Sequence, residues 1–293
     1  MAVISQTEFQ RRKARRKWLG RVFHGLCLLS VTVALGALVV LLIYLVVQGV
    51  TRIDWSFLTS FASRYPEQAG IKAAMLGSIY VVIVAGAVAF TLGVATALYL
   101  EEYAARSTFA RIAKINISNL AGVPSIVYGL LGLQIFVHSL HLGKSVLAGG
   151  FTLALLILPI VIVAAGEAVR SVPPSLREGS YALGATRWQV IWHMVIPQAF
   201  PGILTGVILA VSRAIGETAP LIAMGALTFV PFTPDSPLSR FTVLPIQIFN
   251  WTSRPQAGFQ EAAAAGIIVL LVILLVMNAG AVILRNRFQN KWE

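Results

Sequence analysis

Apolar residues in this chain form long runs that short polar segments separate. Six runs reach the length of a membrane-spanning helix, which needs about 20 largely apolar residues. They are Val22–Val47, Ala73–Leu100, Ile117–Leu140, Val146–Ala168, Ile203–Leu227 and Ala262–Leu284. Pro124, Gly129 and Gly132 interrupt the third run, and such breaks are tolerated where neighbouring helices or water satisfy the freed backbone groups. The pattern predicts an all-α polytopic membrane protein with six transmembrane helices.

Composition agrees with this prediction. The chain is 57% hydrophobic and 12% charged, with a mean hydropathy of +0.81, whereas about a quarter of the residues in a soluble protein are charged. Its net charge of +12 would suggest a nucleic-acid partner in a soluble protein, but basic and aromatic residues are not interleaved as such binding requires. Cys27 is the single cysteine, which excludes an intrachain disulfide and a thiolate metal site.

The positions of Lys and Arg predict the orientation, because loops on the inner side of a membrane carry the excess of positive charge. With both termini inside, sixteen of the 23 Lys and Arg residues lie in internal segments, six lie in external loops, and Arg213 lies within a span. The basic run RRKARRK at 11–17 then serves as a topology and lipid-headgroup anchor beside the first span. We therefore expect both termini in the cytoplasm.

These boundaries divide the chain into a basic N-terminus (1–21), a first transmembrane helix (22–48), a five-helix transmembrane domain (73–284) and a tail (285–293). The transmembrane domain includes an internal loop at 170–200 and an external loop at 228–261. The first apolar run is longer than the roughly 7–15 residues of a signal-peptide core, so we expect a retained helix and not a cleaved signal.

The internal loop is polar and punctuated by proline. Pro173-Pro174 cannot continue the fourth span as a helix. Ser175-Leu-Arg-Glu178 has the capping-box form S-x-x-E, which predicts a short helix that starts near Leu176. Gly184 suits the left-handed residue that ends such a helix.

A second short helix is predicted after this glycine. Thr186-Arg-Trp-Gln189 is another capping box, so a helix should run toward Val195 and end before Pro197. Two short helices that meet at Gly184 would form a compact knuckle. The pattern leaves open whether this knuckle docks a partner or rests on the lipid headgroups.

The fifth span contains Arg213 and Glu217, although a charge at the centre of a membrane helix costs roughly 2.5–3.5 kcal/mol on insertion scales. The two residues are four apart and can shield one another on one helix face. Pro220 frees the carbonyl of Gly216, so we expect the helix to kink or unwind there. One interpretation is a salt bridge that locks the bundle. The other is an anion path, because a guanidinium offers a planar fork of donors suited to phosphate-like oxyanions.

The internal loop resembles the EAA loop of ABC-importer permeases, which reads E-A-A, three residues, G, nine residues, I-x-L-P. Glu178, Gly184 and Pro197 keep its spacing, while Gly179-Ser180 replace the alanines and Met194 and Ile196 replace the isoleucine and leucine. In that family the loop is a coupling helix that sits in a cleft of the ATPase subunit. The resemblance implies this role for Arg177, Glu178, Gly179, Ser180, Tyr181, Ala182, Leu183 and Gly184.

Longer stretches resemble the phosphate ABC-importer permeases of the PstA type. They are LYLEEYA (98–104), GVPSIVYGLLG (122–132), REGSYALGAT (177–186), SRAIGETAPL (212–221) and LPIQIFNW (244–251). The resemblance implies a type I ABC importer permease of MetI-like fold in a bacterial inner membrane. It also implies a translocation path for phosphate beside Arg213, Glu217, Thr218 and Pro220.

The same resemblance implies three kinds of partner: a second, PstC-type permease as a heterodimer, a dimer of PstB-type ATPase subunits, and an external PstS-type phosphate-binding protein. ATP and Mg would be bound by the ATPase, and no cofactor is expected in this chain. Gly143-Lys144-Ser145 matches the end of the P-loop motif G-x-x-x-x-G-K-[ST]. However, the first glycine of that motif is replaced by His138, so we expect no ATP site in this chain. We expect a transport subunit and not an enzyme.

Two other functions stay open at this point. A permease of the same fold could carry another oxyanion or a phosphonate, and an integral membrane enzyme could act on phospholipid. The enzyme would need clustered nucleophiles, acid–base pairs or metal ligands near the headgroups, and the sequence shows none apart from the charged pair in the fifth span. Glu101 and Glu102 are expected at the internal interface, while Glu167, His138 and His141 receive no role.

The external loop at 228–261 contains five prolines, at 231, 234, 237, 245 and 255, which favour an ordered structure. Within it, Phe241–Trp251 is predicted to form a short helix at the membrane interface. Its position outside the membrane suggests contact with a delivering binding protein.

Overall fold

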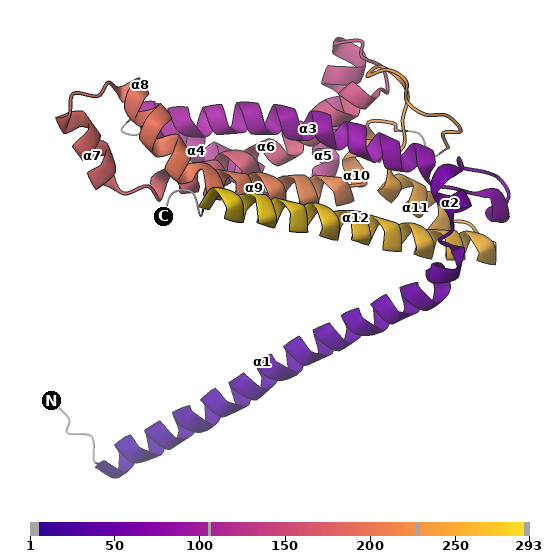
Figure 1. Cartoon of the computed structure of the whole chain (residues 1–293). Coiled ribbons are helices and arrows are strands. Elements are labelled where there is room, and N and C mark those ends of the chain that lie inside the picture. The colour runs from indigo at the N-terminus through magenta and orange to yellow at the C-terminus, as the bar shows by residue number, and fades with distance from the viewer. Residues whose placement is uncertain (1–5, 105–106, 227–228, 290–293) are drawn as a thin grey trace.

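The computed structural model describes residues 6–104, 107–226 and 229–289, and these ranges are almost entirely helical (Figure 1). The α-helices are α1 (Gln6–Gly49), α2 (Trp55–Thr59), α3 (Lys72–Leu98), α4 (Thr108–Leu120), α5 (Ser125–Gly132), α6 (Val146–Arg170), α7 (Pro174–Ala182), α8 (Arg187–Val190), α9 (Ile196–Gly216), α10 (Ala219–Ala223), α11 (Leu244–Thr252) and α12 (Ala257–Gln289). Three π-helical segments are η3 (Tyr99–Tyr103), η4 (Leu133–Ser139) and η5 (Ile191–Val195), and two 3₁₀ turns are η1 (Val50–Arg52) and η2 (Pro66–Gln68). The predicted all-α fold class is confirmed.

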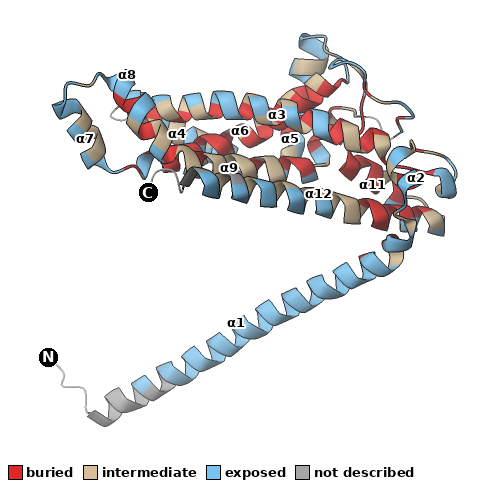
Figure 2. Ribbon diagram, in the orientation of Figure 1, coloured by how far each residue is buried: buried red, intermediate tan, exposed pale blue. Residues whose placement is uncertain are grey.

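Helices α3, α6, α9 and α12 lie side by side as a bundle, and α6 packs against both α3 and α9 (Figure 1). In the most apolar window of α6, 67% of the residues are buried, so this helix forms the centre of the core (Figure 2). Helices α7 and α8 lie at one end of the bundle, which we call the α7 end. Helices α2 and α11 lie at the opposite end, the α11 end (Figure 1).

Small residues set the spacing of the bundle. A Cβ on Gly93 of α3 would lie 2.6 Å from a methyl of Val161 in α6. On the other side of α6, a Cβ on Gly206 of α9 would lie 2.4 Å from the Cβ of Ala164. Glycine is therefore required where these helices approach, because any side chain would push them apart.

Among the described residues, five helical segments are long and apolar enough to cross a membrane, and α3, α6 and α12 confirm the second, fourth and sixth predicted spans. The prediction of one helix over Ile117–Leu140 is wrong, because α4 and α5 meet at a bend of 102°. Pro124 disfavours a helical conformation for the residue before it, so the chain turns there. Tyr128 of α5 donates its hydroxyl to the carbonyl of Leu120 in α4 at 2.8 Å, which holds the bend. Counted as one broken span, the bent pair raises the number of candidate crossings among the described residues from five to six.

The first helix is longer than predicted, and it leans away from the bundle (Figure 2). It begins at Gln6 and therefore extends beyond the N-terminal end of the first predicted span. Residues 16–44 are all exposed. The helix meets the bundle at its last turns, where Leu45 is buried and a Cβ on Gly49 would lie 2.6 Å from the backbone of Ala264 in α12.

The fifth span begins earlier than predicted. Helix α8, η5 and α9 form one helical segment from Arg187 to Gly216, so the expected end before Pro197 is wrong. A proline ring crowds the carbonyl four residues back and lacks a donor. The π-helical turn η5 widens the helix directly before Pro197, which accommodates both effects. The internal loop is thereby shortened to the turns around α7.

The loop that the sequence predicts to be external folds into the bundle in its described part, residues 229–261. Helix α11 forms within the predicted segment, but Phe241 and Trp251 are fully buried. The hydroxyl of Ser78 in α3 accepts the N–H of Leu244 at 2.8 Å, which anchors the start of α11. The prediction of an interfacial helix is therefore wrong, because α11 is apolar on most of its faces and packs into the core.

Helix α2 completes the α11 end. It begins at Asp54, whose carboxylate accepts the N–H of Phe57 at 2.6 Å and the hydroxyl of Ser56. These two hydrogen bonds favour the ionised carboxylate and lower the pKa of Asp54 below its usual value. Phe57 then packs on Trp251 of α11, with ring centroids 5.9 Å apart.

Candidate functional site

The charged segment of the fifth span lies where α9 breaks. Helix α9 ends at Gly216, Glu217 adopts an extended backbone (φ −78°, ψ 122°), and α10 begins at Ala219. Pro220 occupies the first turn of α10, where its missing N–H is not needed. The predicted interruption between Gly216 and Pro220 is confirmed.

Arg213 and Glu217 contact each other across this break. The Nε of Arg213 donates to Oε1 of Glu217 at 3.4 Å. Both residues belong to one segment of the chain, so their contact does not tie two helices together. The Arg213 side chain is 52% exposed and that of Glu217 18% exposed. These observations disfavour a salt bridge that locks the bundle, and they place the guanidinium on the outer surface of the chain.

Thr218 and Pro220 follow the break, the first half-buried and the second buried. A Cβ on Gly129 of α5 would lie 2.5 Å from the carbonyl oxygen of Pro220. The two interrupted helical pairs, α4–α5 and α9–α10, therefore pack on each other at this point. Irregular backbone at membrane depth is tolerated where it is buried in protein or lines a water-filled cavity.

A side-chain hydrogen bond beside Arg213 escaped the sequence analysis. Ser212 donates its hydroxyl to Oδ1 of Asn278 in α12 at 2.5 Å. Polar contacts of this kind hold neighbouring membrane helices together. The bond fixes the rotation of α9 against α12 and thereby the outward position of Arg213. Asn278, a polar residue inside the last apolar run, was the sequence feature that could have indicated this hydrogen bond.

The knuckle at the α7 end consists of α7, the turn at Gly184 and α8, residues 174–190. Helix α7 begins at Pro174 with no side-chain cap, so the predicted capping box at Ser175 is wrong. Proline is favoured at the first helical position because its φ is already helical, and it starts the helix earlier. Gly184 has a φ of 81°, as predicted. The capping box of Thr186 and Gln189 is also present.

Most of the residues that resemble the EAA loop lie on the surface of the knuckle. Leu183 is 91% exposed at its tip. Ser180 is half-buried and donates its hydroxyl to the carbonyl of Leu176 at 2.8 Å. The exposed members of the set are Glu178, Gly179, Tyr181, Ala182, Leu183 and Gly184. These six present a continuous surface that a partner can reach.

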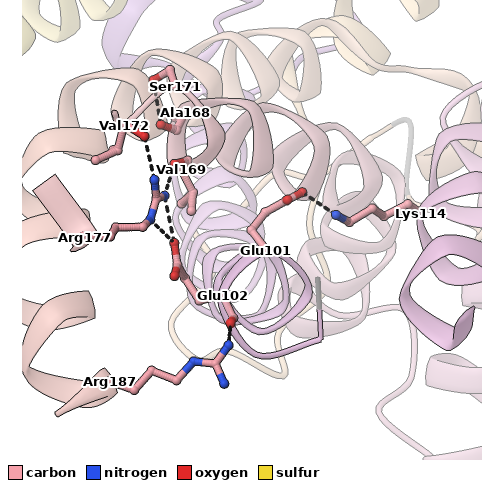
Figure 3. Close-up of polar contacts among 9 residues, drawn as sticks. All are labelled: Glu101, Glu102, Lys114, Ala168, Val169, Ser171, Val172, Arg177 and Arg187. Atoms are coloured by element: carbon pink, nitrogen blue, oxygen red, sulfur yellow. Dashed lines mark hydrogen bonds and ion pairs between the residues drawn. The ribbon is translucent and has the colours of Figure 1, made fainter. Parts of the chain in front are cut away.

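Arg177 differs from this set because its guanidinium faces the bundle (Figure 3). Its Nε and Nη2 donate to Oε1 of Glu102 at 3.1 and 2.9 Å. Its Nη2 and Nη1 also donate to the carbonyls of Val169 and Val172, at 2.8 and 2.6 Å. The Glu102 side chain is 8% exposed, so this ion pair is largely removed from solvent.

Three more basic residues complete an ionic network at the same end, and Figure 3 shows two of them, Arg187 and Lys114. Arg187 of α8 donates to the backbone carbonyl of Glu102 and lies over the ring of Tyr103, 4.8 Å from its centroid. Glu101 pairs with Lys114 of α4 at 2.9 Å and with Arg170 of α6 at 3.1 Å. The two adjacent glutamates thus bind different elements. Both glutamates were expected at the internal interface, but their partners lie on other elements of the chain. The basic residues of the adjoining loops were the sequence feature that could have indicated them.

In the described part of the chain, His, Cys, Asp and Glu side chains form no group of three that could hold a metal ion. His141 uses Nδ1 for a hydrogen bond with the carbonyl of Ser139 at 3.1 Å. Glu167 is exposed and pairs with Arg170 at 3.4 Å.

A helical membrane bundle with a surface knuckle at one end and an ionic pair at a broken span is the architecture of a transporter permease. Residues 89–290 match the family described as the binding-protein-dependent transport system inner membrane component, and the chain belongs to this family. It is therefore a multi-pass inner-membrane permease of an ABC transporter, a subunit without catalytic activity or cofactor of its own. It works with ATPase and binding-protein partners.

Two curated relatives cover most of the chain. The probable ABC transporter permease protein YqgI of Bacillus subtilis is 32% identical over 86% of this chain and 89% of its own length. The phosphate transport system permease protein PstA of Haemophilus influenzae is 34% identical over 94% of this chain and 96% of its own length.

The fold is also that of a solved importer. An inward-facing structure of the MetNI methionine ABC transporter matches with a TM-score of 0.60 at 15% identity, covering 72% of this chain and 93% of that chain. This likeness confirms the predicted MetI-like fold. Membership of a transport family also sets aside the phospholipid enzyme.

Proposed function

We propose that this chain is a permease subunit of an importer of inorganic phosphate and that it forms half of the translocation path. The observation that carries the proposal is the exposed guanidinium of Arg213 at the break of α9, next to Glu217. The relative from Haemophilus influenzae, which is named for phosphate transport, supports the same substrate.

The chemistry of the break suits an oxyanion in transit. A guanidinium donates two parallel hydrogen bonds to a phosphate and keeps its charge at any physiological pH. Glu217 holds Arg213 from one side and competes with the anion, so that binding stays weak enough for release. Thr218 and Pro220 shape the turn that brings the carboxylate back toward Arg213. The same chemistry would accept another oxyanion or a phosphonate, which is the alternative substrate.

The other half of the path would come from a second permease of the PstC type. Arg213 lies on the outer surface of this chain, where a second subunit can face it. Helix α1 supports the same arrangement, because residues 16–44 are exposed and lie apart from their own bundle (Figure 2). An external PstS-type protein would deliver phosphate at the α11 end.

Coupling would take place at the α7 end, which we place in the cytoplasm together with both termini. The exposed face of the knuckle, from Glu178 to Gly184, would sit in a cleft of a PstB-type ATPase dimer that binds ATP and Mg. Closure of that dimer on ATP would push the knuckle and tilt the helices around Arg213. A path between subunits can open and close in this way without any change within α6.

Uptake of labelled phosphate at low external concentration tests the substrate. Cells that lack this chain should recover uptake when the wild-type chain is restored, with assembly of the complex verified in the membrane. Excess arsenate, a close oxyanion analogue, should compete with it, whereas excess methionine should not. An assembled complex that takes up no phosphate would move the substrate to another oxyanion.

If the exposed face of the knuckle binds the ATPase, reversing one charge on that face should weaken the binding. Glu178 is exposed on α7, so Glu178→Lys should leave the fold intact and weaken binding of the ATPase subunit. We expect less ATPase to co-purify with the permease pair and ATP hydrolysis that loaded binding protein no longer stimulates. Glu67→Lys reverses an exposed carboxylate at the α11 end and should co-purify normally. Normal co-purification of both variants would contradict the docking assignment.

A further inference from the structure

The ionic network at the α7 end converges on one residue. Arg177 of α7 binds the carboxylate of Glu102, and Arg187 of α8 binds its backbone carbonyl (Figure 3). The two short helices of the knuckle are therefore fastened to the same point, the π-helical segment η3 at the end of α3. Gly184, with a φ of 81°, forms the turn between them.

Arg177 also occupies the end of the central helix. The carbonyls of Val169 and Val172 belong to the last turn of α6 and the turn after it. Terminal carbonyls of a helix have no partner within the helix, and cationic side chains satisfy them and complement the negative end of the helix dipole. One guanidinium thus joins three elements: α7, the end of α6 and, through Glu102, the end of α3.

The contact between Arg177 and Glu102 is largely buried, so it is not part of a docking surface. The side chains of Glu102 and Arg177 are 8% and 19% exposed, whereas Leu183 at the tip of the knuckle is 91% exposed. Such an ion pair resists rearrangement, because removing one partner leaves an uncompensated charge out of water. A partner protein would therefore contact the outer face of the knuckle and leave this inner contact intact.

We propose that Glu102 is the residue through which the knuckle moves the bundle, with Arg177 as a positioning residue and not as an ATPase contact. The proposal rests on the proposed docking of the knuckle. When the ATPase displaces α7, Arg177 carries the ends of α3 and α6 with it. Helix α3 packs along α6 and also contacts α9, so the displacement reaches the helix that bears Arg213.

A distance measurement tests this tie without any transported substrate. Cys27 is exposed and would be replaced by serine. Spin labels would then be placed by Ala95→Cys on α3 and Ser175→Cys on α7, both exposed positions. In the complex with its ATPase, the label-to-label distance should be the same without nucleotide and with a non-hydrolysable ATP analogue. In Arg177→Gln the distance should change between the two states.

Hydrolysis and docking complete the test. Arg177→Gln should still co-purify with the ATPase, but stimulation of its ATP hydrolysis by loaded binding protein should fall to the basal level. The double variant Glu102→Gln with Arg177→Gln carries no unpaired charge at this contact, so it should reach the membrane at the wild-type level while stimulation stays basal. Arg111→Gln, an exposed site on α4 at the same end, should behave as wild type.

Three results would overturn the proposal: a label distance that changes with nucleotide in the wild type, stimulation that persists in Arg177→Gln or in the double variant, or loss of the ATPase from Arg177→Gln. Loss of the ATPase from Arg177→Gln would mean that Arg177 belongs to the docking surface. Because the distances are measured without any transported substrate, they stay informative even if phosphate proves not to be the substrate.

Discussion

Replacing Arg213 by glutamine is expected to reduce phosphate uptake to the background of cells that lack the chain, with the complex still assembled. Glutamine keeps much of the length of the side chain and removes the charge. Because Arg213 is 52% exposed and contacts a residue of its own segment, the fold of the bundle does not depend on it. Arg213→Lys keeps the charge without the planar fork and should retain part of the uptake.

Uptake of labelled phosphate, with the membrane level of each subunit measured in parallel, checks this expectation. Arg287→Gln is the matched control, since it removes an exposed arginine near the end of α12 and should transport normally. Wild-type uptake by Arg213→Gln would remove Arg213 from the path. A loss of assembly in Arg213→Gln would show instead that the residue holds the subunits together.

Gly206→Leu is expected to prevent the bundle from closing. A Cβ at this position already lies 2.4 Å from the Cβ of Ala164 in the central helix, and a leucine adds three further carbons. Overpacking of a filled core costs roughly 1–3 kcal/mol, and occasionally more. Since α9 carries Arg213 and continues into the knuckle, its displacement affects every functional part of the chain.

The thermal stability of the detergent-solubilised complex and the membrane level of the chain are the measurements for this variant. Gly280→Leu provides the comparison, because nothing lies within 4 Å of a Cβ on Gly280 in α12. We expect Gly206→Leu to be lost from the membrane and Gly280→Leu to accumulate normally. Equal stability of the two variants would mean that α6 and α9 can separate at no cost.

Hydrophobic pattern predicted the helices that consist of uninterrupted apolar residues, such as α3, α6 and α12. It failed where prolines act through their surroundings. Pro124 lies between α4 and α5, whose axes meet at a bend of 102°. Pro197, in contrast, lies within a continuous helical segment, because the π-helical turn before it accommodates the proline. Sequence alone does not distinguish the two outcomes, because the difference lies in which neighbouring groups satisfy the backbone. The burial of α11 was missed for a related reason, since an apolar segment suits an interface and a core equally.

The site was predictable as far as it is local in sequence. Arg213 and Glu217 are four residues apart, and Pro220 indicated the break between the helices. The ionic network was not predictable, because Glu102 meets Arg177 and Arg187 only after the chain has folded back across the bundle. For the same reason, the position of Arg177 within a surface motif did not reveal that its side chain faces inward.

The contact between α1 and α12 has a consequence for how the chain is made. Helix α1 leaves the ribosome long before α12, yet the two helices pack on each other. During translation α1 therefore stays in the lipid because its own surface is apolar, and Gly49 can contact Ala264 only after α12 has been synthesised. A premature stop codon before α12 removes this site of attachment for α1, so the packing of the newly made subunit depends on the synthesis of α12.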